Sequence, residues 1–180
     1  MMTRWTGTLL LALVTGALLT GCAPDASEPT PTPSFSSDED AFAAAEATYR
    51  AYVDALNQVD LSDPATFEPV YAWTTGEANA AARQSFSQMN ADNWSVSGQS
   101  TPTLVEVLSM GGADLDVAEL AVCLDVASVT LTDGDGVSMV APDRPDVQTM
   151  LVNLVSSDTT PTLWVIESFE SRQQGPKCAG

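Results

Sequence analysis

The chain has 180 residues, of which 24 are acidic and 6 are lysine or arginine, so its formal net charge is −18 at pH 7. This charge repels nucleic-acid phosphates, and the absence of histidine excludes histidine-dependent catalysis and histidine-rich zinc sites. We therefore expect no nucleic-acid partner. We also expect no cofactor and no metal ion.

The first segment of the chain is typical of an export signal. Arg4 is its only charged residue, and an apolar run from Leu9 leads to Leu19-Thr20-Gly21-Cys22. The run has secretory length and is too short at this position for a membrane-spanning helix. The residues themselves leave open a lipoprotein signal, an ordinary secretory peptide with a chance cysteine, or an uncleaved anchor.

The last four residues of that segment resemble the bacterial lipobox. The resemblance implies that residues 1–21 are cleaved as a lipoprotein signal peptide and that Cys22 then carries the lipid. Two or three acyl chains hold a soluble domain on a membrane, whereas one chain does so only marginally. We therefore expect a protein that is anchored by lipid to the extracytoplasmic face of the cell membrane.

With Cys22 bound to lipid, the remaining cysteines are Cys123 and Cys178. Exported proteins occupy compartments where disulfides persist, so we predict a Cys123–Cys178 bridge. It would stabilise the domain by up to about 4 kcal/mol in the chain-entropy model and would hold the polar C-terminus. Two unpaired thiols are the alternative.

The amino-acid composition divides the rest of the chain into a tether and one domain. Residues 22–37 combine prolines with serine, threonine and acidic residues, a composition that stays extended. Residues 38–180 are enough for a single domain with a full core. The capping-box pattern of Ser36 and Glu39 precedes apolar residues at helical spacing up to Leu56, which predicts a first helix.

Two more helices are expected after the first. Asp63-Pro64 supplies a cap and a first-turn proline for a short second helix. Thr74 and Glu77 form another capping-box pattern, followed by an alanine-rich helix that reaches about Met89.

Beyond Asn93 the apolar period becomes that of strands. A turn of the kind that joins antiparallel strands is predicted at Asp133-Gly134-Asp135-Gly136. Helices followed by strands predict an α+β domain, with the helices packed on one face of a curved antiparallel sheet. The expected strands are Trp94–Val96 continuing as Thr103–Val107, Leu115 to about Leu131, a return from Val137 to Val140, Val147–Val155, and Leu163–Phe169.

Several short motifs together resemble actinobacterial lipoproteins of unknown function, over about residues 38–178. The resemblance implies an NTF2-like cone, in which three N-terminal helices cover a bent sheet, and it carries no agreed activity. The motifs are Tyr49-x-x-Tyr52, Asn57-x-Val59-Asp60, Asp63-Pro64, Trp73-Thr74-Thr75-Gly76-Glu77, Cys123-Leu124-Asp125-Val126 and the C-terminal Cys178.

The resemblance to this cone also implies a pocket between the helices and the concave face of the sheet. The candidate pocket residues are Tyr49, Tyr52, Asp125, Trp73 and Trp94. Aromatic walls with a few polar groups are a common pocket lining. The alternative places both tyrosines in the core and Asp125 on the solvated side of its strand.

Some relatives of this fold are isomerases or cyclases that use a pocket carboxylate as a base and a tyrosine as an oxyanion donor. A buried carboxylate has a raised pKa and can take a proton from carbon next to a carbonyl. The residues that could supply this chemistry here are Glu106, Asp125, Glu167, Asp54, Tyr49 and Tyr52.

A charged loop, Asp143-Arg144-Pro145-Asp146, offers Arg144 as a contact for a protein partner, although its charges could also simply neutralise one another. We interpret the protein as a non-enzymatic binding module for a small apolar ligand or for an envelope protein partner. A pocket enzyme of the isomerase or cyclase type is the alternative.

Overall fold

The computed structural model describes residues 35–112 and 115–179. The expected signal peptide over residues 1–21, the lipid site Cys22 and the first part of the tether lie outside the described residues. No helix within the described ranges is both long enough and apolar enough to cross a membrane.

Among the described residues, four helical segments precede the strands. They are α1 (Asp38–Leu56), the 3-10 helix η1 (Pro64–Phe67), α2 (Glu68–Tyr71) and α3 (Gly76–Ala91).

The helix α1 covers the range expected of the first helix. Its N-cap is Ser37, one residue after the predicted cap, and the Ser37 hydroxyl accepts a hydrogen bond from the Asp40 backbone N–H at 3.1 Å. The first turn contains three acidic residues, which interact favourably with the positive end of the helix dipole.

The start of the second helical segment agrees with the prediction, and the start of α3 differs from it. The Asp63 carboxylate accepts a hydrogen bond from the Ala65 N–H, and Pro64 follows it in the first turn. At α3 the N-cap is Thr75, which makes no side-chain cap bond, while the Thr74 hydroxyl donates to the carbonyl of Tyr71. The predicted capping box at Thr74 is therefore wrong, because this side chain is used to close the preceding turn.

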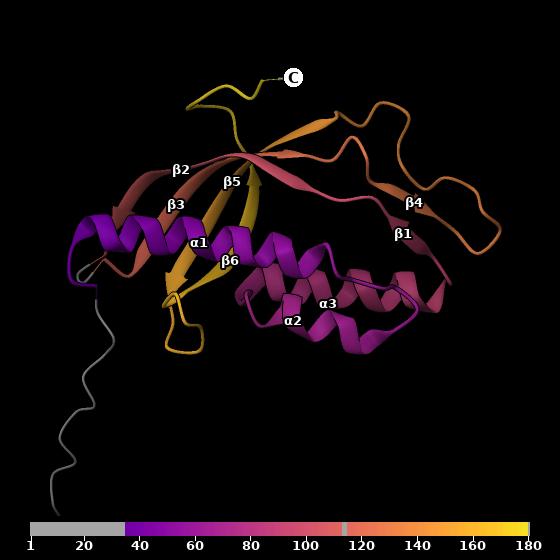
Figure 1. The fold of residues 1–180 in the computed structure, drawn as a ribbon, viewed down its shortest axis with the longest axis horizontal. Coiled ribbons are helices and arrows are strands. Elements are labelled where there is room, and N and C mark those ends of the chain that lie inside the picture. Colours follow the sequence, from indigo (N-terminus) through magenta and orange to yellow (C-terminus); the bar gives the residue numbers. More distant parts are fainter. Residues whose placement is uncertain (1–34, 113–114, 180) are drawn as a thin grey trace, which may run out of the picture. The chain divides into compact units, whose positions relative to one another are not determined.

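The strands form a four-stranded sheet and a separate two-stranded sheet, and all their pairings are antiparallel (Figure 1). The larger sheet has the order β2-β3-β5-β6, and the smaller one pairs β1 with β4. The strands are β1 (Ser95–Ser97), β2 (Thr101–Gly111), β3 (Val117–Asp125), β4 (Thr130–Thr132), β5 (Val147–Ser156) and β6 (Trp164–Ser171).

Three of the expected strands need correction. The strand predicted as Trp94–Val96 continuing as Thr103–Val107 is divided into β1 and β2, which belong to different sheets. The single strand predicted from Leu115 to about Leu131 is divided into β3 and β4, which belong to different sheets. The predicted return from Val137 to Val140 is not a strand, and only an isolated bridge joins Ser138 to Thr132. The turn before it does form, since the Gly136 N–H donates to the Asp133 carbonyl at 3.0 Å.

The larger sheet is bent by irregular pairing. Register shifts occur in β2 on both sides of Leu104–Val107, and another lies between Asn153 and Leu154 in β5. Such bulges bend a strand and increase its twist. Helix α1 packs on β2, β3 and β6, and α3 packs on β6, so the fold is the expected α+β cone of helices on one face of a curved antiparallel sheet.

Two hydrophobic clusters fill the domain. The main cluster joins α1 to the larger sheet and includes Tyr49, Leu120 and the fully buried Trp164. The smaller cluster is built on Leu61, Phe67 and Tyr71, with apolar side chains of α3, β4 and Trp94 around it. Phe35 stacks on Trp164 with ring centroids 5.6 Å apart, so a residue expected in the tether is part of the domain.

The predicted disulfide between Cys123 and Cys178 is present, with the two Cα atoms 5.6 Å apart. It fastens the C-terminal residues to β3, beside the guanidinium of Arg172. That side chain is only 8% exposed and donates hydrogen bonds to the carbonyls of Met150 and Gln174. The bridge and the arginine together hold the chain end that follows β6.

Candidate functional site: an apolar cavity beside the small sheet

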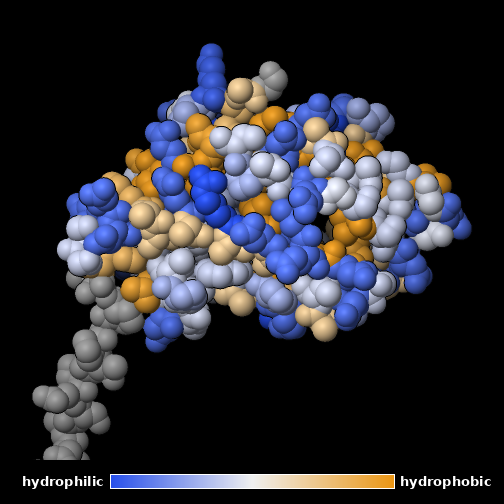
Figure 2. Space-filling view, in the orientation of Figure 1, coloured by the Kyte–Doolittle hydropathy of each residue, from blue (hydrophilic) through white to orange (hydrophobic). Residues whose placement is uncertain are grey.

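A cavity of about 550 Å³ lies between the end of α1, helix α3 and the two-stranded β1–β4 sheet. Figure 2 shows a hollow on this side of the domain, with hydrophobic side chains inside it. The lining residues are Leu56, Asn57, Val59, Leu61, Phe86, Met89, Val96, Ser97, Gly98, Ser100, Val129, Leu131, Met139, Val140, Ala141 and Arg144.

The lining differs from the rest of the chain in charge. Of its 16 residues, 11 are apolar, none is aspartate or glutamate, and Arg144 is the one charged residue. The whole chain, in contrast, has 24 acidic residues. The cavity is therefore an apolar space with one cation in a strongly acidic protein.

Arg144 is held by the backbone of the neighbouring turn. Its Nη2 donates to the carbonyl oxygens of Val126 and Val129, at 2.8 Å and 3.0 Å. The side chain is half-buried, and it makes no ion pair with a described carboxylate; the ion pair within the described residues joins Arg83 to Glu68. Arg144 thus has its guanidinium fixed at the cavity wall, and its predicted role as a contact for a protein partner stays a prediction.

The wall formed by β1 and β4 depends on a close approach of two backbone segments. Gly98 has φ +85°, and a Cβ atom at this position would lie 2.0 Å from the carbonyl oxygen of Ser128. Only glycine accommodates both the positive φ and the contact. The hydroxyl of Ser128 also donates to the Gln99 carbonyl at 2.9 Å, which closes the end of the small sheet.

None of the five predicted pocket residues lines this cavity. Tyr49 is completely buried in the main cluster, and Tyr52 packs between Tyr49 and Phe169, with ring centroids 6.0 Å and 5.4 Å away. Burial raises the pKa of the Tyr49 phenol and raises the pKa of Tyr52 to about 12. The Tyr49 hydroxyl has no hydrogen-bond partner within the described part of the chain.

The other predicted pocket residues lie in separate places. Trp73 is half-buried next to the bridge between Thr74 and β6, and Trp94 packs on the smaller cluster. Asp125 is half-buried at the end of β3, where its carboxylate accepts a hydrogen bond from the Ala127 N–H at 2.9 Å. The structure therefore does not bring these three side chains to one site.

The carboxylates that could have acted as a catalytic base are not buried. Asp54, Glu106 and Glu167 are exposed, and no aspartate or glutamate is buried in the described ranges. These residues also contain no group of three side chains suited to bind a metal ion. The arrangement of a buried carboxylate beside a tyrosine is not found in this part of the chain.

The sequence did contain a weak signal for the cavity. Phe86 and Met89 fall on the apolar stripe predicted for the third helix, but a stripe of this kind does not distinguish residues that face a core from those that face a cavity. Val96 and Leu131 belong to three-residue strands, and Met139 belongs to the segment that was predicted as a strand. Their common location depends on the pairing of β1 with β4 over a long sequence separation.

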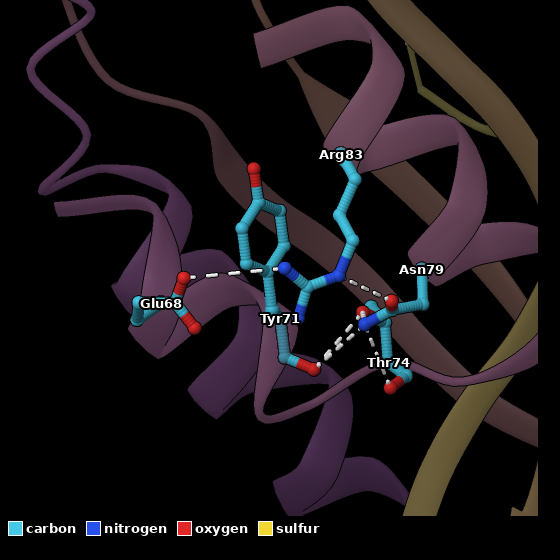
Figure 3. A network of polar contacts seen from close by, with 5 residues as sticks. All are labelled: Glu68, Tyr71, Thr74, Asn79 and Arg83. Carbon is cyan, nitrogen blue, oxygen red and sulfur yellow. Dashed lines mark hydrogen bonds and ion pairs between the residues drawn. The ribbon is translucent and has the colours of Figure 1, made fainter. Parts of the chain in front are cut away.

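A separate polar network fixes α3 relative to α2 (Figure 3). The guanidinium of Arg83 lies 4.0 Å from the centre of the Tyr71 ring, and its Nε donates to Asn79 Oδ1 at 2.8 Å. Asn79 in turn donates to the carbonyls of Tyr71 and Thr74, at 3.1 Å and 3.2 Å. Arg83 also forms a long, exposed ion pair with Glu68, a kind of contact that contributes little to stability. These contacts fix the orientation of α3. Residues at the other end of this helix line the cavity.

No protein-family model matches the chain, and no curated protein sequence matches it. Solved structures that resemble it include a protein from Novosphingobium aromaticivorans described as an aromatic ring hydroxylase, with 15% identity, a TM-score of 0.48 and coverage of 74% of this chain and 87% of that one.

The intermembrane-space region of the chloroplast protein ARC6 has 16% identity, a TM-score of 0.47 and coverage of 71% and 93%. VirB8 of Agrobacterium tumefaciens has 12% identity, a TM-score of 0.36 and coverage of 76% and 94%.

Proposed function

We propose that the protein is a lipid-anchored, extracytoplasmic binding module that holds a small apolar ligand in the cavity beside the β1–β4 sheet. The observation that carries this proposal is the cavity itself, which has a volume of about 550 Å³ and a largely apolar lining. Both properties lie in the range of sites that bind small molecules. The lipid anchor rests on the lipobox resemblance at Leu19-Thr20-Gly21-Cys22.

A binding role fits the cavity better than catalysis does. The polar groups in its lining are Asn57, Ser97, Ser100 and Arg144. An amide, two hydroxyls and a guanidinium include no general base that works near neutral pH. The isomerase or cyclase alternative has no buried carboxylate to support it among the described residues.

Native mass spectrometry of the exported protein tests the binding role. We expect an extra mass that is retained under native conditions and lost on denaturation. Replacing the small cavity residue Ala141 by tryptophan should abolish the extra mass by filling the space. Ala43→Trp is the matched control, because Ala43 is exposed on α1 and lies outside the cavity lining. Equal retention in the two variants would contradict a ligand in this cavity.

The anchor is tested by fractionation of cells that produce the chain with Cys22→Ser. We expect the native protein to sediment with membranes and to carry the mass of acyl chains at its N-terminus, and the variant to lose the acyl mass. A native protein without acyl groups would exclude the lipoprotein assignment.

A second candidate occupant is an apolar segment of an envelope protein. Val137 is 59% exposed and Met139 is also exposed, and both lie on the loop that borders the cavity. Exposed apolar residues at the edge of an apolar groove are typical of contact surfaces. Under this alternative, Val137→Ser should reduce cross-linking to a partner while leaving retention of a small molecule unchanged.

A further inference from the structure

We infer that the ligand of this cavity carries one anionic group, which binds the guanidinium of Arg144, while the apolar part of the ligand fills the space between α3 and the β1–β4 sheet. The inference rests on the proposed function, because it specifies the chemistry of the molecule that the cavity would bind. It depends on three observations about Arg144 and its surroundings.

The first observation is that part of the Arg144 guanidinium has no partner. Both recorded hydrogen bonds use Nη2, to the carbonyls of Val126 and Val129. The donors on Nε and Nη1 have no partner within the described residues. A guanidinium has five N–H donors in a planar fork that fits carboxylate and phosphate groups. The donors that remain can therefore accept an anionic group without breaking the bonds that hold the side chain.

The second observation is that no carboxylate within residues 35–112 and 115–179 forms an ion pair with Arg144. Its sequence neighbours Asp143 and Asp146 are exposed, and neither forms an ion pair with it. None of the other 15 lining residues is charged, so an anion in the cavity meets one cation and no nearby carboxylate from the lining.

The third observation concerns the apolar walls, which limit what the rest of the ligand can be. The 11 apolar residues give no hydrogen bonds from their side chains, so a ligand with several charges would lose hydration without replacement. The long-range field of a chain with net charge −18 also disfavours polyanions, although salt screens this field beyond about 8 Å under physiological conditions. An apolar molecule with a single anionic group satisfies both conditions.

Arg144 is also prepared for binding. The two carbonyl contacts restrict its side chain before a ligand arrives, so less conformational entropy is lost on binding. Hydrogen bonds between charged groups are stronger than those between neutral groups. Loss of the Arg144 guanidinium should therefore weaken binding of an anionic ligand more than binding of a neutral one.

Methionine methyl NMR of the full-length, exported chain carrying Cys22→Ser tests the inference, since the substitution removes acyl chains that could compete for the cavity. Met89 and Met139 line the cavity, whereas Met110 and Met150 do not. The probes are decanoate, decyl phosphate and decanol, which share an apolar chain and differ in the head group. We expect at least one anionic probe to shift the Met89 and Met139 signals and to leave the Met110 and Met150 signals in place.

The variant Arg144→Gln should weaken binding of that anionic probe by about tenfold or more, and should change decanol binding by less than about twofold. Arg50→Gln is the matched control, since it makes the same charge change on an exposed residue of α1 outside the cavity. Arg144→Lys should restore part of the lost affinity because it keeps the positive charge but not the planar fork. Binding of only one anionic probe would assign the head group as carboxylate or phosphate.

Two results would overturn the inference, and they differ in their consequence for the proposed function. If Arg144→Gln weakens decanol and the anionic probes equally, the anionic head group is excluded, but the apolar binding cavity remains. If no probe shifts Met89 or Met139 in the unsubstituted cavity, both this inference and the proposed apolar ligand are contradicted. The comparison of probes in the protein with native Arg144 does not depend on whether the Arg144 variants fold.

Discussion

The side chain of Asn57 and the backbone of Ser100, 43 residues apart in the sequence, are joined by two hydrogen bonds. Asn57 Nδ2 donates to the Ser100 carbonyl at 2.9 Å, and Asn57 Oδ1 accepts from the Ser100 N–H at 2.8 Å. Asn57 is the C-cap residue of α1, and Ser100 precedes the first residue of β2. The pair therefore fixes the end of the helix to the entrance of the strand, and both residues line the cavity.

Changing Asn57 to aspartate tests this connection. The carboxylate keeps the acceptor for the Ser100 N–H but replaces the donor with an oxygen that faces the Ser100 carbonyl. We expect a loss of about 1–3 kcal/mol in the free energy of unfolding, measured by urea denaturation. Gln84→Glu is the control, because it makes the same chemical change at an exposed residue of α3 whose side chain forms no hydrogen bond within the described residues, and it should alter stability by less than about 0.5 kcal/mol. Equal losses in the two variants would indicate a general effect of added negative charge.

The close approach of Gly98 to Ser128 gives a second prediction. In Gly98→Ala, the new methyl group would clash with a backbone oxygen in addition to the strain of the positive φ. Gly136 also has a positive φ, +81°, but nothing lies within 4 Å of a Cβ atom built there. We expect Gly136→Ala to lose about 1 kcal/mol and Gly98→Ala clearly more, with shifts of the Met89 and Met139 signals. Similar losses at both glycines would show that the contact at Gly98 relaxes without strain.

Reduction of the Cys123–Cys178 bridge should lower stability. The cysteines are 55 residues apart, and the chain-entropy model gives a loss of up to about 4 kcal/mol in the free energy of unfolding. Denaturation curves with and without reductant measure this loss, and intact mass confirms that the bridge has opened. Cys178→Ser should unfold at the same denaturant concentration as the reduced protein. An unchanged curve for the fully reduced protein would mean that the bridge contributes nothing to stability.

Stability should also fall at alkaline pH because of the tyrosines. Burial raises the pKa of Tyr49 and Tyr71 above the ordinary value of 10.0, and raises the pKa of Tyr52 to about 12. The folded protein then keeps phenol protons that the unfolded chain has already released above about pH 10. The contribution of these groups is complete below pH 10 and is lost as pH rises through the folded pKa values.

Rapid pH-jump measurements of phenolate absorbance test this prediction, with urea curves at each pH. We expect delayed ionisation in the folded protein and a smaller alkaline slope for Tyr52→Phe. Ionisation of all three tyrosines near pH 10 before unfolding would contradict the burial that the structure gives to Tyr49 and Tyr52.

Several elements that depend on local chemistry were predicted correctly from the sequence. The stripe of α1 and the Asp63-Pro64 start depend on near neighbours in the chain, and both are present in the structure. The Cys123–Cys178 bridge could be predicted because few cysteines remain to be paired. The α+β class follows from the order of the elements, which a sequence shows directly.

The cavity could not be located in the same way, because it depends on pairings between distant segments. The alternation of apolar and polar residues from Leu115 to Leu131 predicted one long strand. In the structure the chain turns after Asp125, and β4 pairs with β1 in a separate sheet. Because of this division, Val129 and Leu131 line the cavity and do not belong to the larger sheet. The orientation of Arg144 was equally hidden, since its two acceptors are backbone carbonyls, which any residue type provides.

The cavity is associated mainly with the smaller of the two hydrophobic clusters. Leu61, Phe86, Met89 and Leu131 line the cavity and belong to the smaller cluster, whereas the larger sheet and α1 share the main one. Substitutions in the smaller cluster can therefore reshape the cavity while the main core continues to support the domain. Substitutions confined to this end of the domain would therefore change which ligand fits, with the framework of α1 and the larger sheet retained.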